Sequence, residues 1–254
     1  MATRANKTTR IVCISDTHSR YDFVLPSGDI LVHTGDFSKS GLQDEVEYFI
    51  TWLKSLTKYR LKIFIAGNHD HTLDPISYER CWKRWHRGRK QNCAPVGHLI
   101  HDRSLATNFG IIYLEEQLFV DNVTGLSFYG RRYLFLSSPY EPASHNGTFY
   151  FPINSVEIMQ ACSRIPNNVD VLLTHCPPAS ILDTTITGEH VGCDELLSCV
   201  NVAKPRLHVF GHIHEAHGRI DQGSTIFVNA SICNRKYQPV QAPIVIDLEL
   251  KEKT

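Results

Sequence analysis

The densest group of chemically competent side chains in this sequence lies at residues 63–70. An apolar run, Ile-Phe-Ile-Ala, is followed directly by Gly-Asn-His-Asp. Asn68, His69 and Asp70 can supply a metal ligand, a proton donor and an orienting carboxylate. Polar residues directly behind a short apolar run are typical of an α/β protein, which presents its chemistry at the carboxyl ends of buried strands.

Four other apolar segments end in the same way, in aspartate or histidine. Each motif alone is weak, because D-x-H or G-D is common by chance. Since parallel strands bring their carboxyl ends to one edge of a sheet, the five strand ends together predict a shared metal site. The side chains at the other four ends are Asp16 and His18, Asp36, His175, and His212 with His214.

The predicted ligand set contains carboxylate, amide and imidazole groups and no cysteine. It is too large for one tetrahedral ion and suits two divalent or trivalent ions, with Mn, Fe or Zn favoured. Two ions about 3.5–4 Å apart can clamp a phosphoryl group and acidify a bridging water. Asp36 is the natural carboxylate to lie between them, whereas spacing alone does not decide the role of His69. The candidate ligands are Asp16, His18, Asp36, Asn68, His175, His212 and His214.

The elements that must position these motifs alternate between strands and helices. Residues 10–15, 30–33 and 62–66 read as strands, and a helix lies between the second and the third. Its start is indicated by Ser40 and Gln43, which have the spacing of a capping box. This order predicts a parallel sheet with crossover helices. Further strands are expected at 169–173, 207–210, 225–228 and 244–250, and further helices at 75–89, 154–164 and 192–200.

The middle of the chain has a different pattern, with short β-like pieces separated by turns. Such pieces predict a second sheet that is antiparallel or mixed. Residues 138–151, rich in Pro, Gly, Ser and aromatic residues, are expected to form a loop. The expected pieces are 98–101, 110–114, 118–120, 126–129 and 133–136.

Composition limits the classes of protein to consider. The 254 residues are 42% hydrophobic and 20% charged, as in a globular protein with a sizeable core. Basic and acidic residues number 26 each, so no global field attracts nucleic acid or anionic lipid. No run approaches the roughly 18 apolar residues of a membrane span, and no secretory signal is evident, so a cytoplasmic location is expected. We expect one domain over residues 10–250 behind a disordered lead-in at 1–9. The eight cysteines form no C-x-x-C pair and are expected to be free thiols.

Three acidic or imidazole side chains have simpler interpretations than metal binding. Asp29 precedes its strand, so it is expected in a turn at the opposite edge of the sheet. His33 lies inside a strand, which favours a hydrogen-bonded core histidine. His190 has no strand-end context, although its segment leaves contact with substrate open.

The motifs D-x-H, G-D, G-N-H-D, T-H and G-H-x-H, in this order from residue 16 to residue 214, resemble the calcineurin-like metallophosphoesterase superfamily. A closer resemblance is to the class III-type phosphodiesterase subfamily related to the MPPED proteins. It rests on His175-Cys-Pro-Pro and on residues 188–192, 206–214 and 227–234. The resemblance implies an α/β fold, a four-layer α-β-β-α sandwich of two mixed sheets with a dinuclear metal site at the strand carboxyl ends.

The resemblance also implies a role for each site residue. It places His69 beyond the metals, facing the leaving oxygen, and places Asp70 where it holds the His69 imidazole. The first metal would be held by Asp16, His18, Asp36 and His214, and the second by Asp36, Asn68, His175 and His212.

The expected function is metal-dependent hydrolysis of a small-molecule phosphodiester, with cyclic nucleotides among the candidates, by attack of a bridging hydroxide. One alternative is a nuclease, because the basic stretch 80–90 contains Trp82 and Trp85, although a solvated helix face fits it better. Another is a metal-bound regulatory scaffold with weak activity. Relatives usually run from Y-G directly to S-P, so the intervening residues 131–137 leave the pocket wall and the substrate open.

Overall fold

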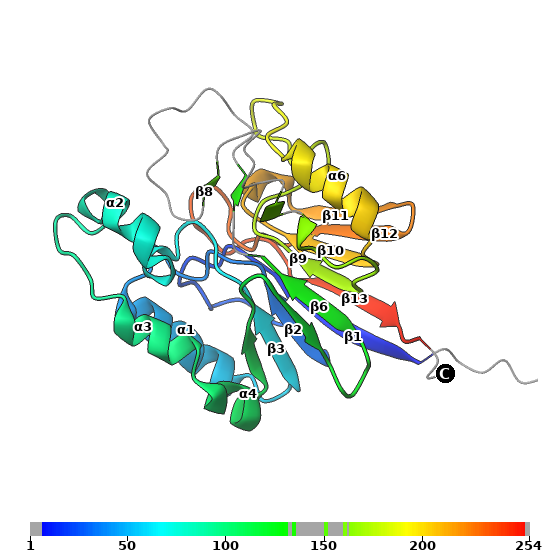
Figure 1. Ribbon diagram of the computed structural model, residues 1–254, viewed down its shortest axis with the longest axis horizontal. Coiled ribbons are helices and arrows are strands. Elements are labelled where there is room, and N and C mark those ends of the chain that lie inside the picture. The colour runs from blue at the N-terminus through cyan, green and yellow to red at the C-terminus, as the bar shows by residue number, and fades with distance from the viewer. Residues whose placement is uncertain (1–6, 132–133, 136–149, 152–159, 162, 252–254) are drawn as a thin grey trace, which may run out of the picture.

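Two mixed β-sheets, stacked face to face, form the centre of the molecule (Figure 1). The computed structural model describes residues 7–131, 134–135, 150–151, 160–161 and 163–251. The first sheet has the order β13-β1-β2-β3-β4, in which β1 to β4 are parallel and β13 is antiparallel to β1. Its strands are β1 (Thr8–Ile14), β2 (Ile30–His33), β3 (Leu61–Phe64), β4 (Ile111–Tyr113) and β13 (Ile244–Glu249).

The second sheet has the order β11-β12-β10-β9-β6-β5. Its four central strands are parallel, and an antiparallel strand lies at each edge. A separate pair, β7 (Leu134–Phe135) and β8 (Tyr150–Phe151), is parallel. The strands of the second sheet are β5 (Gln117–Val120), β6 (Ser127–Gly130), β9 (Val171–Leu173), β10 (Leu207–Phe210), β11 (Gly218–Gln222) and β12 (Thr225–Asn229).

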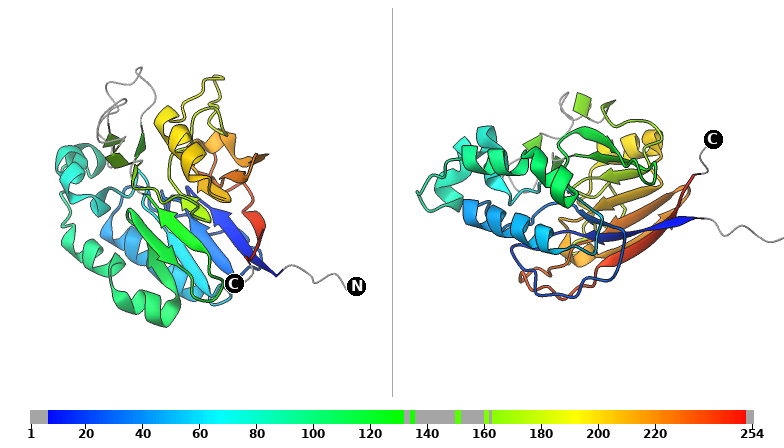
Figure 2. Two further views of the ribbon diagram at one scale, coloured as in Figure 1. Left: turned by 45° about the vertical axis from the view of Figure 1, so that its right-hand side comes forward. Right: turned by 90° about the horizontal axis from the view of Figure 1, so that it is seen from below.

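Helices cover both outer faces of the stacked sheets (Figures 1 and 2). Helices α1 (Gln43–Ser55), α3 (Ala94–Ile100) and α4 (Arg103–Phe109) pack on the first sheet, and α6 (Asp194–Ala203) packs on the second. Between the sheets, apolar side chains of both inner faces form a third buried layer. Three apolar layers between four structural layers confirm the predicted α-β-β-α sandwich of two mixed sheets.

Three further helical elements of the described residues lie near the carboxyl ends of the strands. They are α2 (Pro75–Trp85) and two short 3-10 helices, η1 (His71–Leu73) and η2 (His214–Ala216). Within the described ranges, no helix combines the length and the apolar character needed to cross a membrane. Cys13, Cys81, Cys193 and Cys233 are free, buried thiols, as predicted for these four.

One expected strand is a helix. Residues 98–101 were expected to be β, but they belong to α3 and its C-cap. Pro95 lies in the first turn, where its missing N–H costs nothing, and Val96 and Ile100 are four residues apart and buried on one face. Helical packing of this face therefore overrides the β-like composition.

The predicted capping box is displaced by two residues. Helix α1 begins at Gln43, and it is Glu45 whose carboxylate accepts hydrogen bonds from the backbone N–H groups of Leu42 at 3.1 Å and Ser40 at 3.0 Å. Val46, Phe49, Ile50 and Leu53 form its buried face.

Two other expectations fall largely outside the described residues. Most of the helix expected at 154–164 and most of residues 131–137 lie there. The same holds for the expected loop 138–151, except that Tyr150 and Phe151 form strand β8.

Candidate metal centre

The predicted site residues follow strands of both sheets and meet at the carboxyl edges. Asp16, Asp36 and His212 adopt left-handed backbone conformations, with φ of 53°, 54° and 68°. Such φ values are uncommon outside glycine and cluster at functional sites. The glycines of the G-N-H-D and G-H-x-H motifs, Gly67 and Gly211, leave room for no side chain. A Cβ at Gly67 would collide with the Asp36 carboxylate, and one at Gly211 would collide with the Asp16 carboxylate.

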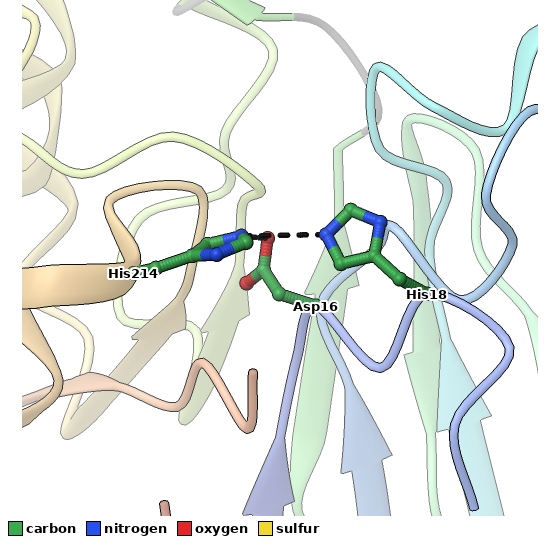
Figure 3. Close-up of side chains that lie close together, drawn as sticks. All are labelled: Asp16, His18 and His214. Carbon is green, nitrogen blue, oxygen red and sulfur yellow. Dashed lines mark hydrogen bonds and ion pairs between the residues drawn. The ribbon is translucent and has the colours of Figure 1, made fainter. Parts of the chain in front are cut away.

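The first cluster is formed by Asp16, His18 and His214 (Figure 3). The Nε2 atom of His214 lies 3.3 Å from Oδ1 of Asp16 and 3.3 Å from Nε2 of His18. One ligand atom of each residue lies within 4.8 Å of the others, and all three side chains are at least nine-tenths buried. This arrangement can hold one ion.

The second cluster is formed by Asp16, Asp36 and His175. The Nε2 atom of His175 lies 3.4 Å from Oδ2 of Asp36 and 3.1 Å from Oδ1 of Asn68. Oδ2 of Asp36 is also 3.8 Å from Nε2 of His18, so this carboxylate faces both clusters. That position is the one a bridging ligand would need.

His212 lies beside the second cluster. Its ring centroid lies 5.1 Å from that of His175, and it lines the pocket over the site. Its backbone N–H donates to the Asp16 carboxylate at 3.0 Å. The structure therefore brings all seven predicted ligands together.

Backbone carbonyls orient two of the imidazoles. Nδ1 of His175 donates to the carbonyl of Thr34 at 2.7 Å, and Nδ1 of His214 donates to that of Asn234 at 3.1 Å. In the neutral ring, with the proton on Nδ1, Nε2 carries the lone pair, and in both rings Nε2 faces a carboxylate of the site.

The pKa values show how this donor set suits cations. Burial lowers the pKa of His18 to about 3 and that of His212 to about 4, which leaves both imidazoles neutral and able to bind metal at neutral pH. Burial by itself would raise the pKa of Asp36, but the nearby imidazoles, above all His175, hold this pKa well below its ordinary value. Burial opposes protonation of His175 too, yet the carboxylates of Asp36 and Asp16 raise its pKa to about 9. Buried carboxylates thus demand positive charge here, and metal ions fit this set.

His69 lies at the mouth of the site. Its Nε2 atom is 3.9 Å from Oδ2 of Asp36, and its ring centroid is 4.8 Å from that of His18. Its Nδ1 atom donates to the carbonyl of Lys39 at 2.8 Å. Nε2 is therefore directed into the pocket.

The expectation that Asp70 holds the His69 imidazole is wrong. Oδ2 of Asp70 accepts the backbone N–H groups of Gly67 at 2.8 Å and Asp36 at 3.0 Å. Oδ1 accepts the N–H of Ser38 at 3.0 Å and its hydroxyl at 2.6 Å. Burial, together with the charge of Asp36, raises the pKa of Asp70 to about 7. Asp70 therefore connects the loops after β2 and β3 and positions Asp36, while the Lys39 carbonyl orients His69.

Sequence reasoning missed the residues that form the rim. The pocket over the clusters has a volume of about 290 Å³, and Glu215, Arg235 and Tyr237 line it with the predicted residues. The Tyr237 ring lies 4.6 Å from that of His18, and the Arg235 guanidinium lies 3.9 Å from the Glu215 carboxylate. Only the position of Glu215 behind G-H-x-H could have been a signal.

The simpler interpretations of the other residues agree with the structure. The carboxylate of Asp29 accepts the backbone N–H of Arg10 at 2.8 Å, at the amino edge of the first sheet. His33 is buried and accepts the N–H of Gly35 on Nδ1 at 3.3 Å. His190 is mostly exposed and pairs with Asp183 at 2.7 Å.

The family of this chain follows from comparison of its sequence with known protein families. The model of the calcineurin-like phosphoesterase family matches residues 9–216. The chain belongs to the calcineurin-like phosphoesterase family. It is accordingly a metal-dependent phosphoester hydrolase by family, and its buried His and Asp groups are able to hold metal.

Relatives with known sequences support this membership. The human Metallophosphoesterase domain-containing protein 1 is 42% identical over 245 residues, which cover 94% of this chain and 71% of that protein. A UPF0046 protein of Caenorhabditis elegans is 32% identical over 250 residues, covering 95% and 76%. The predicted resemblance to the MPPED-related subfamily is thereby confirmed.

A solved structure supports the fold alone. The Phosphopantetheinyl Hydrolase (PptH) from Mycobacterium tuberculosis superposes with a TM-score of 0.57 at 15% identity, with 92% of each chain covered.

Proposed function

We propose that this phosphoesterase hydrolyses phosphodiesters, with His69 as the general acid that protonates the leaving oxygen. One observation carries the proposal. Nδ1 of His69 is tied to the Lys39 carbonyl, so Nε2 is held at the pocket mouth beside Asp36. An imidazole fixed in this way can deliver a proton to an oxygen that leaves phosphorus.

Seven side chains would hold two ions, of which Mn, Fe or Zn suit the donors best. Bound there, the ions would supply Lewis acidity for the phosphoryl group and for the attacking water. Asp36 would contact both ions because its Oδ2 atom faces both clusters. Asp70 holds Asp36 in that position through the backbone. The proposed ligands are Asp16, His18, Asp36 and His214 for the first ion and Asp36, Asn68, His175 and His212 for the second.

The charge of the pocket favours a diester over a monoester. Among the lining residues that the structure describes, Arg235 is the only Lys or Arg, and Glu215 lies 3.9 Å from its guanidinium. A monoester dianion brings one more negative charge than a diester, and this rim offers little to neutralise it. When the ester is unactivated, the departing alcohol group leaves as an alkoxide, and this is the case in which a proton from His69 matters most.

An activity panel tests the proposal. Metal-stripped protein is reloaded with Mn, Fe, Zn or Mg and assayed on bis(p-nitrophenyl) phosphate, p-nitrophenyl phosphate, and 2′,3′- and 3′,5′-cyclic nucleotides. We expect higher kcat/KM on the aryl diester than on the aryl monoester. Preference for the monoester with every metal would refute a diesterase.

A further inference from the structure

Within the described residues, the imidazole of His69 has one hydrogen bond, from Nδ1 to the Lys39 carbonyl at 2.8 Å. A single hydrogen bond fixes one atom of a ring, and the ring can still tilt about that contact. Nε2, the atom that would deliver the proton, lies at another corner of the ring. Because a misplacement of about 1 Å can cost on the order of 10²-fold in rate, the packing around this ring matters for the proposed chemistry.

Four aromatic rings lie next to the His69 imidazole. The centroids of His18 and Trp85 are 4.8 and 5.4 Å from it, both in an edge-to-face arrangement, and those of His71 and Tyr237 are each 6.1 Å away. Spacings of about 4.5–7 Å are typical of interacting aromatic pairs. Trp85 differs from the other three because it comes from α2, a helix that supplies none of the predicted ligands and none of the pocket lining.

Trp85 is itself held in place by its neighbours. Its ring centroid lies 4.5 Å from that of His71, which is fully buried, and the Arg84 guanidinium lies 5.6 Å from the same ring. A side chain that packing holds in one orientation can restrict the ring that it contacts. Trp85 can therefore limit the tilt of His69 without touching substrate.

The next residue of the chain contacts the segment that carries the acceptor of His69. His86, the C-cap of α2, is buried and donates from Nε2 to the Ser40 carbonyl at 2.9 Å. Ser40 directly follows Lys39, whose carbonyl accepts the Nδ1 proton of His69. Nδ1 of His86 is hydrogen-bonded to the hydroxyl of Tyr78, which is buried in α2. Two consecutive residues at the end of α2 thus contact the His69 ring and the backbone beside its acceptor.

We propose that the end of α2 positions the general acid. Trp85 restricts the tilt of the His69 ring, and His86 fixes the Lys39–Ser40 backbone to which that ring is bound. Neither side chain lines the metal pocket, so both act through His69 and are positioning residues. This inference rests on the proposed role of His69. Because α2 carries no predicted ligand, its contacts can be changed without removing a group that would hold metal.

The first test compares leaving groups. The ratio of kcat/KM for methyl p-nitrophenyl phosphate to that for methyl phenyl phosphate is measured on one sample, so that a lower folded fraction cancels. W85L should raise this ratio about 10-fold, because the poorer leaving group depends more on a well-placed proton, and should leave KM and metal content unchanged. W85F should stay near the parent, since a second aromatic ring fills much of the same space.

Trp82 provides the matched control in the same helix. Its ring packs against the ammonium groups of Lys83 and Lys90, at 5.6 and 6.0 Å. The variant W82L should therefore keep the parent ratio. An unchanged ratio in W85L, or equal changes in W85L and W82L, would overturn the role of Trp85.

His86 provides a second, independent pair of variants. H86A removes the hydrogen bond to the Ser40 carbonyl and should raise the same ratio. H86Q should restore the parent ratio in part, because an amide nitrogen can donate to that carbonyl. In the H69A background, neither W85L nor H86A should change the ratio further, since both act through His69. A further rise of the same size in that background would contradict the proposal.

The second test needs no turnover. Exchange of the His69 Nδ1–H proton with water is followed by NMR in protein loaded with Zn, which is diamagnetic, and the signal is assigned by its absence from H69A. The hydrogen bond to the Lys39 carbonyl should protect this proton in the parent. W85L and H86A should speed its exchange about 10-fold or more, and W82L should not. Unchanged exchange in both W85L and H86A would overturn the proposal.

These readouts separate failure of the positioning role from failure of the proposed function. If H69A keeps the parent's dependence on the leaving group, His69 is not the general acid, and exchange of its Nδ1–H proton still decides whether α2 positions the ring. If H69A selectively loses activity on the poorer leaving group, but W85L and H86A match the parent in both ratio and exchange, only the positioning role fails.

Discussion

The two edges of the stacked sheets both contain buried aspartates, but different groups face them. At the carboxyl edge, Asp16 and Asp36 face imidazole nitrogens at 3.3 and 3.4 Å. At the amino edge, the Asp121 carboxylate accepts hydrogen bonds from both terminal nitrogens of Arg60, at 2.9 and 2.7 Å. Asp170 forms a salt bridge with Lys251 at 2.9 Å.

This difference separates function from stability. A buried carboxylate that a guanidinium and backbone N–H groups satisfy is complete within the protein. A pair of buried carboxylates that faces imidazole nitrogens still requires positive charge, which protonated imidazoles or bound metal ions can supply. The aspartates of the carboxyl edge should therefore control metal content, and those of the amino edge should control the free energy of unfolding.

The largest effect should follow Asp36→Ala. This variant removes the carboxylate that faces both clusters, so both ions should lose affinity and activity should fall on the order of 10⁴-fold. Metal content after dialysis and kcat on bis(p-nitrophenyl) phosphate measure the two effects. Stoichiometric metal in D36A would contradict the shared role.

His69→Ala should lower kcat about 10²- to 10⁴-fold and leave metal content unchanged. The loss should be greatest for alkyl leaving groups and smallest for p-nitrophenolate, because a good leaving group needs no proton. A series of aryl and alkyl methyl phosphates measures this dependence. Loss of metal from H69A would instead make His69 a ligand.

Asp70→Asn should weaken metal affinity about 10- to 100-fold, because an amide cannot accept all the N–H and O–H groups that the Asp70 carboxylate accepts. Its dependence of rate on the leaving group should match that of the parent, since Asp70 does not contact the His69 ring. A steeper dependence, as in H69A, would restore the orienting role that the hydrogen bonds contradict.

Asp121→Asn should cost about 1–3 kcal/mol of unfolding free energy with no change in metal content. Burial by itself would raise the pKa of Asp121, but the hydrogen bonds from Arg60 and the Thr124 hydroxyl outweigh burial and lower this pKa. Its stabilisation is therefore present above the unfolded pKa of about 3.9 and is lost as pH falls through the lower folded pKa. Urea unfolding from pH 7 to pH 2.5 should show the parent and D121N converging in acid. A constant difference would contradict this.

The smallest effect should follow Asp247→Asn. The Arg10–Asp247 pair, at 2.8 Å, is about half exposed on both sides, so solvent screens it. Neither the urea midpoint nor metal content should change measurably. A shift as large as that of D121N would show that exposure does not distinguish the two pairs.

Much of the fold and of the ligand set could be predicted because the signals are local. An apolar run followed by glycine and a polar residue marks a strand end, and parallel pairing then brings such ends together. At residues 98–101 the local pattern predicts a β-strand, but the contacts of Val96 and Ile100 with the core decided for helix.

The sequence by itself determined the five strand ends, the seven candidate ligands and the family. Only the tertiary structure decided that the Lys39 carbonyl, and not Asp70, orients His69, and that Tyr237 and Trp85 lie against the imidazoles at the rim. The physical reason is that these contacts join segments that no short-range periodicity relates. Which side chain fills such a place depends on packing between layers, which becomes defined only when the whole chain has folded.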